Sequence, residues 1–477
     1  MSRSVGGPMP VPRQEWPLVS PPALGAWSPQ QTVSVILPAR DCQSELDLTL
    51  AGLSEQTYPG ELYDVVVVDD ASAMELRLPE VHPPHCRILR LESAQEHGSG
   101  RARHAGALVA DGEIVLFLDA DIVPTRTHIE AHARWHAVLS DAVVLGRKLF
   151  VDFAGVTAAD VRNATRDDAF ESLLAGRNHK RHTWLENFIL QSANLTQYAE
   201  DTFLAVVGAS VSTPRDLYLE SGGFASFGLR GIVDTEFGYR IFTAGGVLLP
   251  EPQASSYHQG DRSFAVRGDV IKRERSGIAA NYLPLSLFRP TNTGRIWAVP
   301  MVRAVVDARS GRAEEVQVTV DSLLAQSFTD LAVTISPPRH AIPQWLLDYF
   351  AADARVIFAN HEVTSGFPSP FTFVVPAGVV MTPHSLDELM GASAGGDVGV
   401  VRTTVPDLPG PSVELWATRA LHRARRHQGR GDLESAARRL FGETWYSGAS
   451  LGVRRAVIGV TRQGMLVDEQ AKRPVSQ

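Results

Sequence analysis

The segment from Glu113 to Asp121 constrains the fold more than any other part of the chain. Its sequence, EIVLFLDAD, places five apolar residues directly before two carboxylates that are separated by one small residue. An uninterrupted apolar run of this length predicts a strand buried on both faces of a parallel sheet. Asp119 and Asp121 then follow the carboxyl end of that strand, where open α/β sheets bind ligands. The alternative is a solvated turn, because such triplets arise by chance in a chain with 53 acidic residues.

Two carboxylates this close repel each other unless a positive charge lies between them. A divalent cation that carries a diphosphate meets this need, because Mg²⁺ and Mn²⁺ take hard oxygen ligands and phosphate oxygens complete their coordination. The segment therefore predicts a Mn²⁺ or Mg²⁺ site for a phosphate-bearing ligand.

Two further buried strands are predicted upstream, over residues 33–40 and 64–72. Between them, leucines recur at helical spacing over residues 46–53. The order strand, helix, strand implies a parallel pair joined by a right-handed crossover. A glycine-containing segment, residues 98–106, then opens a helix that leads into the strand before Asp119. We therefore predict an α/β fold built on a parallel sheet.

Three of the predicted strands end in residues suited to a ligand site. Pro38 ends the first, Asp70 the second and Asp121 the third. Because parallel neighbours present their carboxyl ends at one edge of a sheet, we expect these residues to converge there. The sequence therefore predicts a nucleotide site at this edge.

In their order along the chain, five segments resemble the inverting family 2 glycosyltransferases with the GT-A fold. The resemblance covers residues 31–262 and departs from the family pattern at two positions: His104 replaces an Asn, and Val233 replaces a Glu before Asp234. The matching segments are residues 37–41, 68–72, 101–106, 118–121, and 222–224 followed by 234–240.

The resemblance implies roles for individual residues. Asp70 would contact the base or ribose of the nucleotide, and Asp121 would reach the metal on the diphosphate. Asp119 would support Asp121 or contact the ribose. Asp234 would be the general base that takes the proton from an acceptor hydroxyl, with an ordinary helix N-cap as the alternative. The remaining donor-binding candidates are Pro38, Ala39, Asp41, Asp69, Arg103 and Ala120.

Several other groups keep two readings. His258 is either a metal ligand that suits Mn²⁺ or a structural histidine. Arg101 and Arg103 either bind phosphate or form salt bridges with the aspartates. The basic segment 177–184 either meets an anionic acceptor or is a solvated loop. Residues 419–430 either graze a membrane that holds a lipid-linked acceptor or form a solvated helix. A further expectation is that the segments 222–224 and 228–231 form a flexible loop able to close over an acceptor.

Composition bounds the molecule without deciding its function. A length of 477 residues suggests two domains, and a net charge of −8 argues against a nucleic-acid partner. Two cysteines suggest neither a metal cluster nor a disulfide framework, so a cytoplasmic location is expected. Peripheral contact with the inner face of the membrane is compatible with this location. No apolar stretch is long enough to span a bilayer. The proline-rich residues 1–31 predict an extended arm or linker.

The second half of the chain repeats a piece of the first. Residues 319–328 have Thr, Leu and Gln at the places they occupy in residues 49–58, and such a repeat indicates a duplicated unit. We expect a strand within residues 296–302 and an equivalence between residues 448–450 and 208–210. The copy lacks the carboxylates, which predicts a catalytic domain over residues 32–295 and a degenerate GT-A-like domain over 296–477. The alternative is an unrelated α/β domain.

The hypothesis that follows is a metal-dependent inverting glycosyltransferase. It would move a sugar from a UDP-sugar to a hydroxyl of a glycan, a lipid-linked molecule or a small molecule, and the resemblance also allows a homo-oligomer. A nucleotidyltransferase or a dinucleotide-dependent oxidoreductase needs a glycine-rich loop after the first strand, and residues 37–41 contain no glycine. A catalytically silent carbohydrate-binding or nucleotide-binding scaffold is the non-enzymatic alternative.

Overall fold

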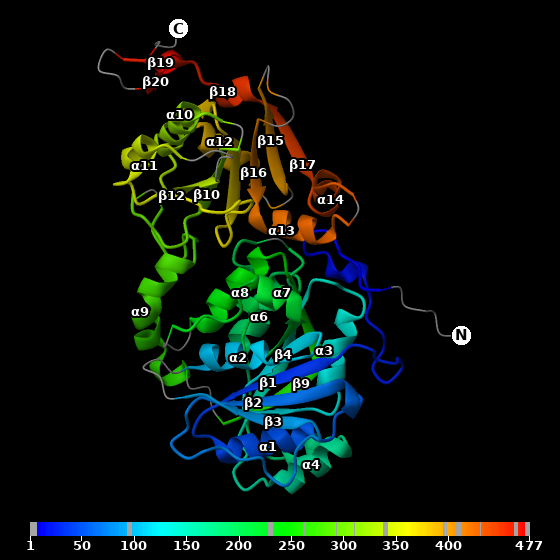
Figure 1. Ribbon diagram of the computed structural model, residues 1–477. Coiled ribbons are helices and arrows are strands. Elements are labelled where there is room, and N and C mark those ends of the chain that lie inside the picture. The colour runs from blue at the N-terminus through cyan, green and yellow to red at the C-terminus, as the bar shows by residue number, and fades with distance from the viewer. Residues whose placement is uncertain are drawn as a thin grey trace. The chain divides into compact units, whose positions relative to one another are not determined.

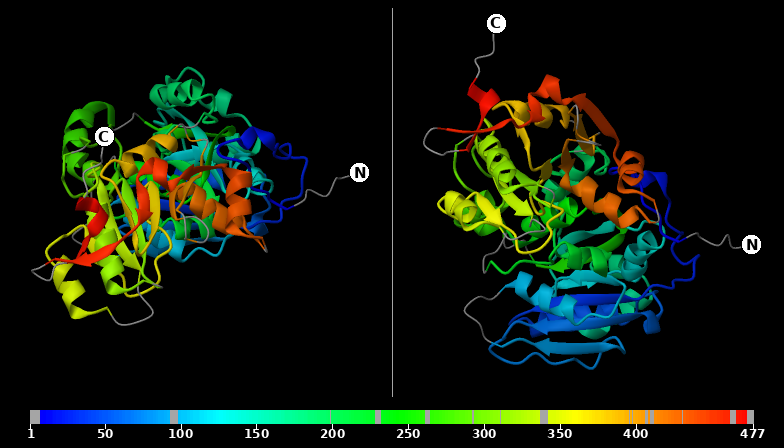
Figure 2. Two further views of the ribbon diagram at one scale, coloured as in Figure 1. Left: turned by 90° about the horizontal axis from the view of Figure 1, so that it is seen from above. Right: turned by 45° about the horizontal axis from the view of Figure 1, so that its top comes forward.

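The computed structural model divides the chain into two compact units, which run from blue to green and from green to red in Figures 1 and 2. The first contains Met1–Phe242 and Gly246–Ile278, and the second Thr243–Gly245 and Ala279–Gln477. The structure describes residues 7–472 except for 93–97, 198, 228–231, 261–263, 292, 310, 337–341, 395, 397, 406, 407, 409–411, 430 and 462–465.

The first unit is built on one mixed sheet in the order β3-β2-β1-β4-β8-β6-β9-β5, with β7 added beside β6. The first four strands of this order are parallel, and β8 runs antiparallel to both β4 and β6. The strands are β1 (Val33–Ala39), β2 (Tyr63–Asp69), β3 (Cys86–Arg90), β4 (Ile114–Leu118), β5 (Ile122–Pro124), β6 (Ala142–Val151), β7 (His179–Arg181), β8 (Ser210–Pro214) and β9 (Val247–Gln259). The predicted α/β class and the fully buried strand before Asp119 are confirmed.

Helices cover both faces of this sheet (Figure 1). Side chains of a strand alternate between the faces, so Leu37 packs with the leucines of α1 while Ile36 lies against Gly106 of α2. The helices are α1 (Gln43–Leu53), α2 (Ser99–Leu108), α3 (His128–His136), α4 (Ala158–Arg166), α5 (Phe170–Leu173), α6 (Thr183–Gln191), α7 (Arg215–Glu220), α8 (Val233–Thr243) and α9 (Phe264–Tyr282).

A ladder of buried histidines and serines joins α3 to β8. His128 Nδ1 lies 2.9 Å from the carbonyl oxygen of Ser255, so this nitrogen carries a proton and Nε2 accepts from the hydroxyl of Ser210. His132 then donates from Nε2 to the Ser210 oxygen and accepts from Ser212 at Nδ1. His136 donates from Nε2 to Ser212. This order leaves all three imidazoles neutral, in agreement with the burial that lowers the pKa of each.

The N-terminal segment lies against the first unit rather than acting as a free linker. Met9 forms a bridge with Leu139, and the buried Gln14 donates to the carbonyl oxygen of Leu248. Trp16 packs edge-on against Trp135 at a ring distance of 5.5 Å. These apolar and polar contacts give the segment a fixed path that its proline content alone does not reveal.

The second unit contains a sheet in the order β12-β11-β10-β13-β16-β15-β17. Its strands are β10 (Val302–Asp307), β11 (Leu331–Ser336), β12 (Val356–Phe358), β13 (Phe371–Pro376), β15 (Val400–Thr404), β16 (Val413–Ala417) and β17 (Glu443–Ser447), and two small pairs join β14 (Val379–Met381) to β18 (Val453–Arg455) and β19 (Ile458–Val460) to β20 (Leu466–Asp468). Its helices are α10 (Ala313–Leu324), α11 (Gln344–Phe350), α12 (Ser385–Ala392), α13 (Thr418–His427) and α14 (Leu433–Leu440). The strand predicted within residues 296–302 was misplaced, because β10 begins only at Val302.

The two sheets share strand order and strand direction. In each sheet the first four strands are parallel, and the fifth strand (β8 or β16) is antiparallel to the fourth. The sixth strand (β6 or β15) is antiparallel to the fifth, and the seventh (β9 or β17) is parallel to the sixth. On this correspondence β16 matches β8 and β17 matches the first part of β9. The predicted equivalence of residues 448–450 with 208–210 is therefore wrong, because the former follow β17 whereas the latter lead into β8.

The repeated Thr and Gln make matching hydrogen bonds in the two units. Gln56 donates to the carbonyl oxygen of Thr125 and accepts from the backbone N–H of Ile129, at 2.9 and 3.1 Å. Gln326 does the same with Thr382 and Leu386, at 2.8 and 3.0 Å. The repeat seen in the sequence thus reflects one way of joining a helix to the segment that follows the central strand.

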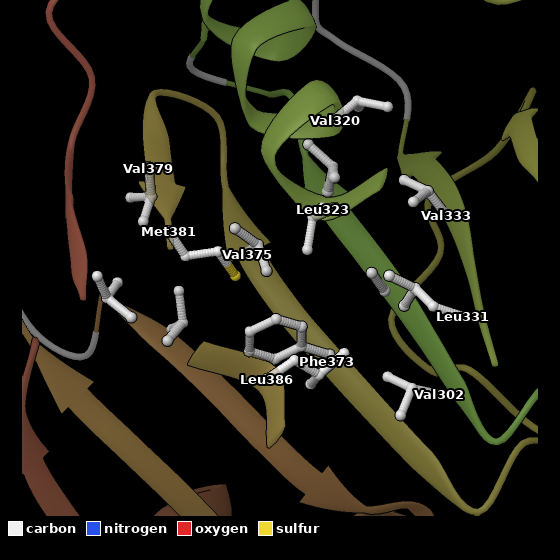
Figure 3. Packing of buried hydrophobic residues seen from close by; sticks show 14 of the residues in the cluster. Val302, Val320, Leu323, Leu331, Val333, Phe373, Val375, Val379, Met381 and Leu386 are labelled. Atoms are coloured by element: carbon white, nitrogen blue, oxygen red, sulfur yellow. The ribbon is translucent and has the colours of Figure 1, made fainter. Parts of the chain in front are cut away.

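The core of the second unit is apolar and continuous. Val320 and Leu323 of α10 point toward Val333 and Val375 of the sheet, and Phe373 fills the space between them and Leu386 of α12 (Figure 3). Among the residues that the structure describes, no helix combines the length and the apolar character that crossing a bilayer requires.

Candidate active site

The three predicted strand ends do converge. β2, β1 and β4 are adjacent and parallel, and Ala39 pairs with Asp69 in the register that also pairs Pro38 with Val68. The backbone N–H of Asp70 donates to the carbonyl oxygen of Ala39 at 2.9 Å. Backbone pairing of the three strands thus forms the predicted edge of the sheet and brings the aspartates at the strand ends together.

Asp69 is fully enclosed and its carboxylate is used by the chain itself. It accepts from the backbone N–H of Ser72 at 2.8 Å and from Arg90 at 2.5 Å. Burial opposes its ionisation, but these hydrogen bonds hold the pKa of Asp69 below its ordinary value. Asp69 therefore shapes the loop after β2. Asp41 spans the same loops from the other side, with its Oδ1 accepting from the N–H of Ala73 at 2.7 Å.

Asp70 is buried beside the start of α2. Its two carboxylate oxygens accept from the Gly98 N–H at 2.8 Å and from Arg101 at 2.7 Å. Of the two readings for the arginines, the structure thus shows ion pairs with aspartates, both here and at Arg103.

Arg103 joins two of the predicted site carboxylates. Its guanidinium donates to Asp119 at 2.5 Å and to Asp234 at 2.9 Å, and its side chain is 2% exposed. The ring of Phe224 lies 5.0 Å from its Cζ. A Cβ at Gly208 would lie 2.5 Å from the Asp234 carboxylate, so the close approach of that backbone requires glycine. Residues from α2, α8 and the turn after β4 thus meet at one buried cation.

Asp234 lies within the first turn of α8, which begins at Val233, and not before the helix as an N-cap would. Val233 itself is buried, and it packs where a Cβ at Gly100 would come within 2.7 Å of its side chain. The Asp234 carboxylate is instead held by Arg103, at 2.9 Å.

His104, the other departure from the family pattern, also has a partner. The Tyr218 hydroxyl accepts from the N–H of Phe224, so it donates its own proton to His104 Nδ1 at 3.0 Å. Burial, with a contribution from the charge of Arg240, lowers the pKa of His104 and agrees with an unprotonated Nδ1. This chain ties α2 to α7 and to the turn that contains Phe224.

The turn at residues 222–224 is held in place and is not the flexible segment that its glycines suggested. Gly222 and Gly223 have φ values of +78° and +62°, which explains the glycines. Arg240 donates to the carbonyl oxygens of Ser221 and Gly223 while also pairing with Glu236. The second half of the predicted loop, residues 228–231, lies outside the described residues.

Asp121 and His258 come together because β5 and β9 pair. Ile122 is opposite His258 in the register, and the Asp121 carboxylate lies 3.4 Å from His258 Nε2. Two ligands that each lie about 2.1 Å from one ion are about 3 Å apart, so this separation suits a shared cation. Asp121 Oδ1 and His258 Nδ1 are buried without hydrogen-bond partners among the described residues. The same part of the chain offers no cluster of three or more such ligands.

The two carboxylates of the Asp-x-Asp segment differ in character. Burial raises the pKa of Asp121, and the negative charge of Asp119 raises it further. Burial also opposes the ionisation of Asp119, but the charge of Arg103 lowers the pKa of Asp119 below its ordinary value. Between them, the carbonyl oxygen of Ala120 accepts from the Thr49 hydroxyl at 2.8 Å and anchors the segment to α1. Asp121 is therefore the member of the pair whose ionisation the surroundings disfavour.

Lys148 is a site residue that the sequence reasoning missed. It lies on β6 two residues before Phe150, so it shares a face of the sheet with Phe150 and with the paired His258. Burial lowers its pKa, while the charges of Asp119, Asp234 and Asp121 act in the opposite direction. No sequence motif marks Lys148, because it is a single lysine within a strand. Only the assembled sheet brings it near these carboxylates.

The two basic segments, residues 177–184 and 419–430, adopt different structures. Residues 179–181 form the exposed strand β7 rather than a loop, followed by α6. In α13, Arg419 and Arg423 are buried beside Phe441, with Cζ atoms 5.4 and 5.1 Å from its ring centre. Neither reading for residues 419–430 therefore holds for these two arginines, because the helix packs its basic side chains inward.

The glycosyl transferase family 2 domain matches residues 34–188. A validoxylamine A glucosyltransferase from Streptomyces hygroscopicus subsp. limoneus is 32% identical over an alignment of 365 positions, which covers 69% of this chain and 78% of that protein. The chondroitin synthase of Pasteurella multocida (strain Pm70) is 25% identical over 329 residues, or 64% of this chain, which span only 33% of the synthase. The mannosyltransferase PcManGT from Pyrobaculum calidifontis, solved with GDP-Man and Mn²⁺, covers 56% of this chain and 66% of its own at 21% identity and a TM-score of 0.36.

The matched segment carries Asp70, Arg103, Asp119 and Asp121, and the Streptomyces enzyme is matched over most of its length. The predicted membership of family 2 is therefore confirmed. The chain belongs to glycosyl transferase family 2.

Proposed function

We propose that the first unit transfers a sugar from a UDP-sugar to an acceptor hydroxyl and inverts the anomeric centre. The observation that carries this proposal is the guanidinium of Arg103, which bonds to Asp119 and to Asp234 at once. One carboxylate belongs to the Asp-x-Asp segment and the other to the first turn of α8. A single buried cation therefore fixes the distance between the donor side and the acceptor side of the reaction.

On the donor side, Asp121 and His258 would hold a Mn²⁺ or Mg²⁺ ion, because their carboxylate and imidazole lie 3.4 Å apart. When bound, this ion neutralises the negative charge that develops on the departing nucleoside diphosphate. The raised pKa of Asp121 and its Oδ1, which has no hydrogen-bond partner among the described residues, support the assignment, because a bound cation would stabilise the charge that burial and Asp119 disfavour. Asp70 and the loop that Asp69 and Asp41 shape would receive the base and ribose.

On the acceptor side, Asp234 acts as the general base. Arg103 bonds to Oδ1, and the second oxygen has no partner among the described residues. That oxygen takes the proton of the acceptor hydroxyl as the hydroxyl oxygen attacks the anomeric carbon. The new carbon–oxygen bond forms on the face opposite the diphosphate, whose own bond to the sugar breaks and which leaves with the electron pair.

Asp234→Asn tests this assignment because it keeps the shape of the side chain and removes the base. We expect turnover to fall by at least about 10²-fold while UDP affinity stays within about twofold of wild type. Steady-state transfer and hydrolysis of UDP-glucose, UDP-galactose and UDP-N-acetylglucosamine would measure turnover. A variant that keeps wild-type turnover would place the base elsewhere.

We further propose that residues 296–477 are a degenerate copy of the catalytic domain, residues 32–295, kept for packing or assembly. The shared strand order and the matching bonds of Gln56 and Gln326 support it. Ser336 ends β11 where Asp69 ends β2, and residues 376–378 carry no carboxylate. The acceptor remains a class: a glycan, a lipid-linked molecule or a small molecule, as the relatives named for chondroitin and validoxylamine A illustrate.

A further inference from the structure

Helix α6 presents an apolar surface that the rest of the first unit does not cover. None of its residues is buried, although its sequence is TWLENFILQ. Trp184 is 49% exposed and Leu190 is 73% exposed. The rings of Trp184 and Phe188, one turn apart, stack at 5.7 Å with an interplanar angle of 22°. An apolar helix of this kind normally packs its face inward, so this surface needs an explanation.

A row of ring contacts connects this surface to the proposed metal site. The ring of His258 lies 4.8 Å from Phe150, which stacks on His182 at 5.9 Å. His182 in turn meets Trp184 edge-on at 6.2 Å. The exposed pair on α6 is therefore the outer end of a row that starts at the donor diphosphate position.

The helix is also fixed in place. Glu186, on the opposite side of α6 from Trp184, forms ion pairs with Arg181 of β7 and with Arg147 of β6. The Arg147 pair has an N–O distance of 3.5 Å. These ion pairs and the ring stack between Trp184 and Phe188 reduce the ordering cost of binding at this surface.

We propose that Trp184 and Phe188 form a binding platform for a carbohydrate acceptor of two or more sugar rings, an inference that rests on the proposed transfer. The C–H face of a sugar ring is apolar and packs flat on an aromatic ring, whereas its hydroxyls need water or polar groups at the rim. The platform binds the rings behind the reacting one. The reacting hydroxyl then faces Asp234 and the donor, toward which the row of rings leads.

A lipid surface is the competing occupant, because the exposed β7 residues include Lys180 and Arg181. Arg181, however, is paired with Glu186. Continuity with the site favours the carbohydrate, since a membrane contact gives no reason for rings to extend inward to His258.

The test is saturation-transfer NMR and calorimetry on the full-length chain with UDP and Mn²⁺ present. The probes are maltotetraose, cellotetraose, chitotetraose and a hyaluronan tetrasaccharide. We expect at least one to bind, Trp184→Ala to weaken its binding about tenfold, and Trp184→Phe to retain most of it. Leu190→Ala is the matched control, because Leu190 is exposed on the same helix but makes no ring contact, and it should bind as wild type does.

Three outcomes overturn the platform: no tetrasaccharide binds the wild type, Trp184→Ala binds with unchanged affinity, or phosphatidylglycerol vesicles bind the wild type and not Trp184→Ala. Asp121→Ala separates this proposal from the proposed function. It should lose Mn²⁺-dependent UDP binding and keep the tetrasaccharide. If it keeps UDP instead, the metal assignment fails while the platform stands.

Discussion

At the scale of single residues, Arg103 organises the site. A buried guanidinium with two carboxylate partners is stable only because each charge is matched by hydrogen bonds, and the fork of the guanidinium can serve both aspartates at once. The neighbouring Phe224 ring covers one of its faces. Lysine has a single ammonium and lacks this geometry.

Arg103→Lys should therefore keep the charge and lose the function. We expect the free energy of unfolding of the first unit to fall by about 1–3 kcal/mol, because one aspartate loses its donor. We also expect turnover to fall by at least about tenfold. Denaturant unfolding and transfer kinetics would measure both. The matched control is Arg101→Lys, which keeps a charge beside Asp70 and should affect UDP affinity more than turnover. The same losses of turnover and of UDP affinity in both variants would contradict the role given to Arg103.

Much of the residue-scale picture follows from the sequence. The strand-end residues Pro38, Asp70 and Asp121 could be placed because parallel strands share an edge. Lys148 could not, because only the pairing of β6 with β9 puts it beside His258. The roles of the two arginines also needed the structure, since helix position alone favours phosphate and aspartate equally.

At the scale of elements, the histidine ladder between α3 and β8 links stability to pH. Burial lowers the pKa of His128 to about 4 and that of His136 to about 3, and lowers that of His132 as well. In the unfolded chain these groups titrate near pH 6.5. A depressed folded pKa means that the unfolded state binds protons first, so stability is lost as pH falls below about 6.5.

The free energy of unfolding of the first unit should thus fall steeply in acid. Three neutral histidines give a slope of about 4 kcal/mol per pH unit between about pH 6 and pH 4. His132→Phe should reduce that slope by about a third, whereas the exposed His85→Phe should leave it unchanged. Denaturant unfolding across this pH range decides the matter. A slope that does not differ between the two variants would contradict a neutral ladder.

Element boundaries were partly predictable. The strand before Asp119 and the helix opened by Ser99 follow from apolar runs and glycine placement. The exposure of helix α6 does not follow from the sequence, because apolar residues at helical spacing predict a buried face and none of the residues of this helix is buried. The first strand of the second unit was placed too early, since Trp297 and Val299 are buried outside any strand.

At the scale of the whole molecule, the two units share one strand order but differ in the helices that connect the strands. The second has no helix between β12 and β13 to match α2. Among the described residues between β15 and β16, it also has no counterpart of α6. These are the elements that carry Arg103 and the aromatic platform in the first unit. The helix-to-strand joint made by Gln56 and Gln326 persists because it serves folding and not chemistry.

Gln56→Ala and Gln326→Ala should consequently cost similar free energies of unfolding, each in its own unit. Both leave a backbone N–H and a carbonyl oxygen without their partner, which costs about 1–3 kcal/mol. Hydrogen exchange of the full-length chain would locate each loss. A variant whose destabilisation is negligible while the other is large would contradict the duplicated plan.

The central claim is that one metal-dependent nucleotide site exists in the chain and that Asp121 builds it. Calorimetric titration of UDP into the full-length protein with Mn²⁺, for wild type and Asp121→Ala, tests it most directly. The account predicts one UDP per chain for the wild type and no Mn²⁺-dependent binding for the variant, with the fold intact by circular dichroism. Undiminished Mn²⁺-dependent binding by Asp121→Ala, or two UDP molecules per wild-type chain, would contradict it.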